Sequence, residues 1–203
     1  MAKVIIDLSM SLDGFITGPN PTKEQGLGEN GEKLHEWYFN GPTASSRSEF
    51  FSPLGASMAV AEEMFDTTGA MVVGRSMYDL VGGWGGNHPI PGVQIFLVTH
   101  HAPESVPQGH SPITVVTDGI ERAVAQAKAA AGEKNVTVGG ANIAQQCLNA
   151  GLVDEIYIHL VPILLGDGTR LFENLAAPLD LEQVEIIEAP GVTHLRYRVA
   201  GAK

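Results

Sequence analysis

Cysteine is almost absent from this chain of 203 residues, in which Cys147 is the only one. A single cysteine cannot form an internal disulfide, and low cysteine use is typical of proteins that work in a reducing compartment such as the cytoplasm. Cys147 falls on the apolar side of a predicted helix. We therefore interpret it as a buried thiol that fills space rather than as a nucleophile.

Positive charge is also scarce. Twelve Lys and Arg residues stand against 23 Asp and Glu residues, which gives a formal net charge of −11. Nucleic acids and anionic membrane surfaces are bound through basic patches, so this composition argues against both as partners. A small anionic ligand remains compatible with it, because backbone N–H groups and a few local cations are enough to hold one.

Long apolar runs are missing as well, and no stretch reaches the roughly 20 residues of a membrane span. The first ten residues alternate like a strand and lack the apolar core of a signal peptide, so we expect no leader. We also expect neither the usual dinucleotide fingerprint nor a nucleotide-triphosphate loop, and the zinc-deaminase motif does not occur. What is present is a globular composition with 44% apolar residues, enough for one sizeable core.

The apolar pattern predicts strands that alternate with helices. Residues 3–10 place Val4 and Ile6 on one face and Ile5 and Asp7 on the other. Further strands are predicted at residues 15–17, 70–73, 93–99, 113–116, 135–138, 155–163, 181–189 and 194–200, and helices at 32–38, 57–66, 77–81, 119–131 and 141–150. This order predicts one layered α/β domain with a mostly parallel sheet and an antiparallel hairpin at its C-terminal edge.

Residues 18–56 are the least regular part of the chain and are rich in Gly, Pro, Ser and Asn. A loop of this length inside a compact domain is usually functional or disordered. This one carries five aromatic residues, which a disordered linker rarely does: Trp37, Tyr38, Phe39, Phe50 and Phe51. We interpret it as an ordered lid or substrate-side wall. The alternative is a surface excursion that packs over the core or contacts a second copy.

Three junctions follow predicted strands and carry glycine or small polar residues. They are Gly74-Arg75-Ser76, Thr99-His100-His101 and Gly139-Gly140-Ala141-Asn142. Ligands of open α/β sheets bind outside the carboxyl ends of the strands, and a helix N-terminus offers free N–H groups to a phosphate. The three junctions together suit an elongated ligand with more than one phosphate. The alternative for each glycine is a tight turn, and for Arg75 a solvated side chain.

Asp13-Gly14 forms a turn signal after the first strand. Its plain interpretation is a turn residue whose carboxylate accepts nearby N–H groups. The alternative is a site residue, and the sequence leaves both open.

At this point the chain resembles the dihydrofolate-reductase-like reductases, and most of all the C-terminal reductase domain of the bifunctional riboflavin-biosynthesis deaminase–reductase. Four segments carry the resemblance in order: VVGRSMYDL, QIFLVTHHAP, VTVGGANIAQQCL and VDEIYIHLVPILLGDGTRLF. The element Ser11-Leu12-Asp13-Gly14 fits the same pattern. The resemblance covers nearly the whole chain apart from residues 20–56.

The resemblance implies a three-layer fold with about eight strands and NADPH as the cofactor. It implies that Gly74, Arg75 and Ser76 lie against the cofactor phosphates, that Thr99, His100 and His101 lie near the 2′-phosphate, and that Gly139, Gly140, Ala141 and Asn142 hold the pyrophosphate. Leu12 and Asp13 would flank the nicotinamide and substrate, and Gly166 and Gly168 would shape the substrate side. The implied reaction is hydride transfer to a small heterocycle or its sugar arm.

Several alternatives stay open on the substrate side. Dihydrofolate reductases carry a W-x-L-P-x-[DE] segment after the first strand, and none occurs between Gly18 and Gly55, yet a pterin reductase remains an alternative. A non-catalytic NADP-binding module is another. The proton could come from Asp13, if that carboxyl were buried with a raised pKa, or from water. The apolar C-terminal hairpin could pair across a two-fold axis to form a homodimer.

Overall fold

The structure is a computed structural model that describes residues 2–201. The strands are β1 (Val4–Ser11), β2 (Phe15–Thr17), β3 (Thr68–Gly74), β4 (Gln94–Val98), β5 (Ile113–Val116), β6 (Asn135–Gly139), β7 (Glu155–Val161), β8 (Thr169–Arg170), β9 (Leu181–Ala189) and β10 (Val192–Val199). The helices are α1 (Ala56–Thr67), α2 (Arg75–Leu80), α3 (Ile120–Ala131) and α4 (Ala141–Asn149), with short 3₁₀ helices η1 (Gly31–Tyr38) and η2 (Gly82–Gly86).

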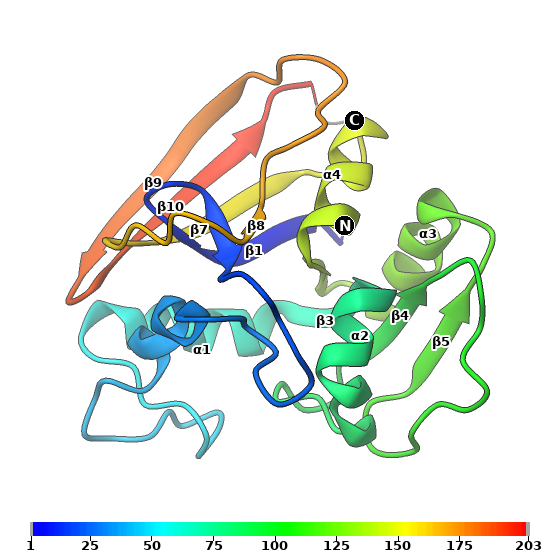
Figure 1. Ribbon diagram of the computed structural model, residues 1–203, viewed down its shortest axis with the longest axis horizontal. Coiled ribbons are helices and arrows are strands. Elements are labelled where there is room, and N and C mark those ends of the chain that lie inside the picture. Colours follow the sequence, from blue (N-terminus) through cyan, green and yellow to red (C-terminus); the bar gives the residue numbers. More distant parts are fainter. Residues whose placement is uncertain (1, 202–203) are drawn as a thin grey trace.

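One eight-stranded sheet organises the molecule, in the order β5-β4-β3-β6-β1-β7-β10-β9 (Figure 1). The strands from β5 to β7 in that order pair in parallel. Strand β10 pairs antiparallel with both β7 and β9. The prediction of a mostly parallel α/β sheet with an antiparallel C-terminal hairpin is confirmed.

Element ends differ from the predictions by one to three residues in most places. Strand β7 ends at Val161 and not at residue 163, because Pro162 has no N–H to continue the ladder. Helix α2 begins at Arg75, two residues earlier than predicted. The short pair of β2 with β8 was not predicted, because a strand of two residues has no readable periodicity.

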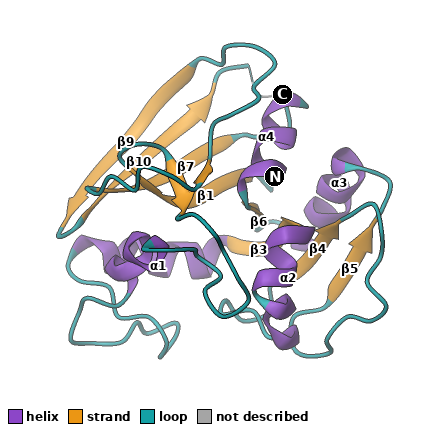
Figure 2. Ribbon diagram, viewed as in Figure 1, coloured by secondary structure: helices purple, strands orange, loops and turns teal. Residues whose placement is uncertain are grey.

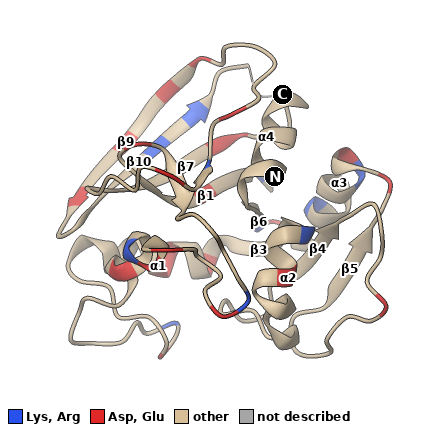
Figure 3. Cartoon of the chain, in the orientation of Figure 1, with Lys and Arg blue, Asp and Glu red and all other residues tan. Residues whose placement is uncertain are grey.

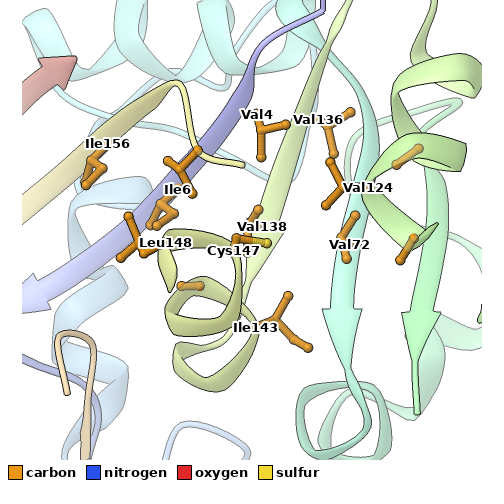
Figure 4. Close-up of a cluster of buried hydrophobic side chains, with 14 of the residues drawn as sticks. Val4, Ile6, Val72, Val124, Val136, Val138, Ile143, Cys147, Leu148 and Ile156 are labelled. Atoms are coloured by element: carbon orange, nitrogen blue, oxygen red, sulfur yellow. The ribbon is translucent and has the colours of Figure 1, made fainter. Parts of the chain in front are cut away.

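The main core lies between the sheet and helices α3 and α4. Figure 4 shows side chains from β1, β3 and β6 that point at these two helices. Val4, Ile6, Val72 and Val138 are fully buried there, and Cys147 is buried among them. Burial raises the pKa of the Cys147 thiol to about 12, so the thiol is protonated and inert.

The opposite face of the sheet is covered by α1, α2 and residues 31–55 (Figure 2). This face carries the second set of alternating β1 residues, among them Asp7, Ser9 and Ser11. It is therefore much more polar than the α3–α4 face. The alternation predicted for the first strand is confirmed by this division.

Residues 18–56 form an ordered segment. Its first part is a loop closed by two backbone hydrogen bonds, from Gly18 N–H to Leu27 O at 2.8 Å and from Glu29 N–H to Pro19 O at 2.9 Å. Its second part contains η1, where a helical piece was predicted, and a chain of aromatic contacts that reaches α1. Tyr38 lies 5.1 Å from Phe51, and Phe51 lies 5.3 Å from Phe65, between ring centroids.

No helix in residues 2–201 is long and apolar enough to cross a membrane. Figure 3 shows that Lys and Arg are scattered over the cartoon and do not gather on one element.

Candidate active site

Four neighbouring parallel strands end at the same edge of the sheet, in the order β4, β3, β6, β1. The residues that follow them are Thr99 after β4, Arg75 after β3, Gly140 after β6 and Leu12 after β1. Neighbouring strands lie about 4.8 Å apart, so this row of strand ends spans roughly 14 Å. Segments as far apart in the chain as Leu12 and Gly140 thus form one continuous edge.

The N-terminus of α4 forms the middle of this edge. Gly140 has a positive φ of 87°, which L side chains rarely adopt, and no side chain caps the helix. The first N–H groups of α4 are therefore available to an anion. Gly139 has a packing role instead, because a Cβ there would lie 2.8 Å from both Met71 Cε and Met77 Sδ. Ala141 is buried behind this turn, and Asn142 is exposed.

Arg75 ties the start of α2 to the end of β4. Its Nε donates to both carboxylate oxygens of Asp79 at 2.8 Å, and its Nη1 donates to the His101 backbone O at 3.1 Å. The Thr99 hydroxyl donates to the same carbonyl at 3.0 Å. The side chains of Ser76, His100 and His101 are exposed beside this junction. A guanidinium held in this way is a preorganised donor for a phosphate.

Gly74 is required by packing as well, since a Cβ there would lie 2.9 Å from Ile143 Cγ1. The close approach of β3 to α4 therefore depends on glycine. A packing role for Gly74 and Gly139 is compatible with a phosphate site, because the close packing brings the N-termini of α2 and α4 side by side.

The Asp13 carboxylate at this edge accepts three hydrogen bonds. Its Oδ1 accepts the Ser11 hydroxyl at 2.6 Å and the Leu165 N–H at 3.1 Å, and its Oδ2 accepts the Gly166 N–H at 2.7 Å. These hydrogen bonds, that of Ser11 foremost, lower the pKa of Asp13 to about 2 against a smaller opposing effect of burial. The carboxyl is thus ionised at neutral pH. The condition under which Asp13 could donate a proton, burial with a raised pKa, is not met.

Leu12, Gly166 and Gly168 lie around Asp13. Leu12 is 62% exposed and donates its N–H to Ile163 O at 2.9 Å. Gly166, at a φ of 77°, presents its N–H to Asp13. Gly168 lets the loop touch β2, because a Cβ would lie 2.0 Å from Thr17 O. These contacts make the turn after β1 and the loop after β7 one unit.

Two residues of this unit stand in the motifs quoted from the sequence but were given no role there. Ser11 donates to Asp13 and accepts the Phe15 N–H at 2.9 Å, so it fixes the turn from inside. Arg170 donates to the Asp13 backbone O at 2.9 Å and lies over the Phe15 ring at 4.3 Å. Its presence among only 12 basic residues, inside the closing LGDGTRLF segment, was the available signal.

One sequence expectation needs correction. Residues 26–31 do match the spacing G-x-G-x-x-G. They lie in the loop that leads into η1, whose first residue is Gly31, and no strand comes directly before them, so they lack the context of a dinucleotide fingerprint. Among residues 2–201, no group of three or more His, Cys, Asp or Glu side chains could hold a metal ion.

Comparison with known proteins places this geometry in a family. The chain is 25% identical to the uncharacterized protein YyaP of Bacillus subtilis over 207 aligned residues, which cover 98% of this chain and 96% of YyaP. A candidate riboflavin biosynthesis protein from Shewanella sp. PV-4 superposes with a TM-score of 0.69 at 22% identity, covering 98% of this chain and 99% of that one. Dihydrofolate reductase from Enterococcus faecalis, complexed with NADP(H), superposes with a TM-score of 0.57 at 13% identity, covering 98% and 96%. The family model of the RibD C-terminal domain matches residues 2–195, and the chain therefore belongs to that family.

Proposed function

We propose that this protein is an NADPH-dependent reductase of the riboflavin-biosynthesis pyrimidine reductase type. In this proposal a hydride passes to a carbonyl or imine carbon of a small heterocycle or its sugar arm. The observation that carries it is the row of four strand ends, in which a free helix N-terminus and a fixed Arg75 stand beside the Asp13 turn. Membership of the RibD C-terminal domain family supports it.

The residues present fit a phosphorylated dinucleotide. The uncapped N-terminus of α4, entered through Gly140, would receive the pyrophosphate. Arg75, with Thr99 and one of the two exposed histidines, would hold the 2′-phosphate, and Gly74 and Ser76 would line the phosphate path. NADPH, when bound, supplies the hydride, and the protein binds and orients it.

Asp13 acts in this proposal as a positioning residue. It is ionised at neutral pH, and its carboxylate holds the 165–166 loop against the end of β1. The substrate side would thus be shaped by Leu12, Gly166 and Gly168. The proton of the reaction would come from water.

Residues 18–56 form the lid of the substrate side in this proposal. The loop before η1 reaches α2, because a Cβ on Gly26 would lie 3.8 Å from the Leu80 Cβ. It therefore reaches the last residue of α2. We further propose a cytoplasmic homodimer, formed through the exposed apolar surface of the C-terminal hairpin.

Two measurements in sequence test the function. NADPH is first titrated by fluorescence, and pyrimidines, pterins and small carbonyl compounds are then screened by the loss of reduced-nicotinamide absorbance. Oxidation with an aminouracil ribotide alone supports the proposal, whereas oxidation with dihydrofolate identifies a pterin reductase. Tight NADPH binding without turnover on any class identifies a binding module. Absence of NADPH binding overturns the proposal.

A further inference from the structure

A row of four polar side chains, three of them buried and Asp7 partly buried, crosses the α1 face of the sheet. The Asp7 Oδ1 lies 2.8 Å from His159 Nε2, His159 Nδ1 lies 2.8 Å from His194 Nδ1, and His194 Nε2 lies 2.9 Å from the Ser57 Oγ. The four residues come from β1, β7, β10 and α1. His159, His194 and Ser57 are at most 3% exposed, so their polar atoms do not hydrogen-bond to bulk solvent.

With Asp7 ionised and both histidines neutral, the position of every hydrogen in the row is determined. The Asp7 carboxylate accepts, so His159 Nε2 carries the hydrogen. The Nδ1 of a neutral His159 then accepts from His194 Nδ1–H, and His194 Nε2 accepts the Ser57 O–H. The result is one chain of donation that runs from Ser57 to Asp7 without a break, with every member satisfied.

Trp37 of η1 packs against the two histidines of this row. Its ring centroid lies 4.7 Å from that of His159 and 4.9 Å from that of His194, and its Nε1–H donates to the Ser9 Oγ at 3.0 Å. Trp37 also stacks on Tyr38 at 3.7 Å, which leads into the aromatic contacts of the 18–56 segment. The row thus fixes both ends of a stretch, Trp37 in η1 and Ser57 at the start of α1.

We propose that the Asp7–His159–His194–Ser57 row is a latch that positions Trp37 and the start of α1 on the substrate-side face, and that it releases them when it takes up a proton. His159 and His194 are positioning residues in this view. The latch lies inside the protein, apart from the strand ends that would hold the cofactor.

Protonation would release Trp37 and the start of α1 by breaking one hydrogen bond, the one between His194 Nε2 and the Ser57 hydroxyl. Each of the three contacts already contains one hydrogen, and only the Ser57 hydroxyl can rotate its hydrogen away, so an added proton enters the row at His194 Nε2. The Nε2–H then points at Ser57, whose hydroxyl hydrogen has no other acceptor among residues 2–201. A buried donor without a partner destabilises the closed arrangement. Burial first, and then the nearby His159, lower the pKa of His194 to about 4, in keeping with a row that resists protonation.

The surrounding charges do not neutralise this effect. The titratable and charged groups that face the row are Arg196 on β10, Tyr157 on β7, Glu63 on α1, Glu185 on β9, and His35 and Tyr38 on η1. Arg196 is paired with both Glu63 and Glu185, at 2.7 and 3.1 Å. Asp7 is the group that favours protonation of His194, and Arg196 and His159 oppose it.

Trp37 itself is the reporter for the test. The chain has two tryptophans, so Trp84→Phe leaves Trp37 alone to emit. Emission of this variant is followed as the pH falls from 8, beside the far-ultraviolet circular dichroism of the same sample. The expected result is a change in Trp37 emission centred between pH 6.5 and about 4, complete before helicity is lost. An emission that stays constant until helicity is lost, or that changes only with it, overturns the latch.

Three further variants are made in the Trp84→Phe background. His194→Asn keeps a donor toward His159 and removes the Ser57 bond, so Trp37 should be open to acrylamide at pH 8 and the acid transition should vanish. Asp7→Asn removes the charge that favours protonation, so the transition should move to lower pH; this variant decides the question if His194→Asn does not fold. The control His110→Asn changes an exposed histidine and should leave the transition in place. An unaltered transition in both row variants overturns the latch.

A second readout rests on the proposed function. In His194→Asn the KM for the substrate should rise while the KM for NADPH stays the same, because only the substrate-side wall is released. If the wild type turns over no substrate, the proposed function fails, and the Trp37 measurements still decide the latch.

Discussion

The carboxylate of Asp13 accepts the backbone N–H of Gly166 at 2.7 Å, across 153 positions of the chain. Through this bond the turn after β1 and the loop after β7 behave as one rigid unit at the carboxyl edge of the sheet. The Ser11 hydroxyl first, and the Gly166 N–H with it, lower the pKa of Asp13, so the carboxyl is ionised at neutral pH, in agreement with the positioning role that we propose for it.

Asp13→Asn should lower turnover by about 10- to 100-fold while NADPH affinity stays nearly constant, because small misplacements of a site are that costly. The Asn amide nitrogen cannot accept the Gly166 N–H, so the loop loses one anchor. Steady-state kinetics and NADPH titration measure the two effects. Asp118→Asn, which changes an exposed acid between β5 and α3, is the control. An unchanged turnover number would remove Asp13 from the mechanism.

Arg75→Gln should weaken NADPH binding by about 10- to 100-fold, the loss of one charge-assisted hydrogen bond. NADH binding should change much less, because NADH lacks the 2′-phosphate. Fluorescence titration with both cofactors measures the difference. Arg122→Gln is a matched control, since Arg122 also pairs with an acid four residues away, Asp118, at the start of a helix. An equal loss of affinity for NADPH and NADH would mean that Arg75 contacts a part of the cofactor other than the 2′-phosphate.

Gly140→Ala should destabilise the fold by about 1–2 kcal/mol, because a Cβ is strained at its φ of 87°. It should also reduce NADPH affinity, since the entry to α4 shifts. Gly132→Ala is the control for strain alone: Gly132 has a φ of 64° and ends α3, away from the candidate site. Thermal unfolding and NADPH titration are compared for both. If the two variants bind NADPH equally well, α4 does not hold the cofactor.

Acid should destabilise the fold between pH 6.5 and about 4. Burial lowers the pKa of His35, His88 and His194 to about 4, so the unfolded chain binds more protons than the native one in this range. Their contribution to stability is therefore complete above pH 6.5 and lost as the pH falls toward 4. Unfolding midpoints in urea should follow this course.

His88→Asn tests one of these three groups by itself. Asn can keep the acceptor that His88 Nδ1 offers to the Ile90 N–H, and it does not titrate. The slope of stability against pH should become shallower in this variant and stay unchanged in His110→Asn. A slope equal to that of the wild type would show that His88 does not contribute.

Ile186→Lys should convert the proposed dimer to a monomer. Ile186 and Val184 of β9 are 48% and 49% exposed, and a shallow apolar pocket lined by Leu160, Ala189 and Val192 lies beside the turn of the same hairpin. A lysine in a two-fold contact should raise the dimer Kd by at least about tenfold. Light scattering after size exclusion measures the mass, with Val81→Lys as an exposed apolar control on α2's end. A wild-type protein that is monomeric at high concentration contradicts the dimer.

Most of the elements and their order could be predicted from the amino-acid sequence. Periodicity of two and of 3.6 residues depends on near neighbours, so the strands, the helices and the two faces of β1 could be predicted. The strand-end junctions could be predicted for the same reason, because glycine and small polar residues mark the ends of strands locally. Pro162 ended β7 as its chemistry requires.

Which of these residues meet depends on the three-dimensional arrangement of the elements. The hydrogen bonds of Asp13 to the 165–166 loop, and the row of Asp7, His159, His194 and Ser57, join elements up to 153 positions apart. Such contacts are set by strand order and register, which no local pattern encodes. The same holds for residues 18–56, whose aromatic side chains became ordered because the sheet and α1 offered them a surface to cover.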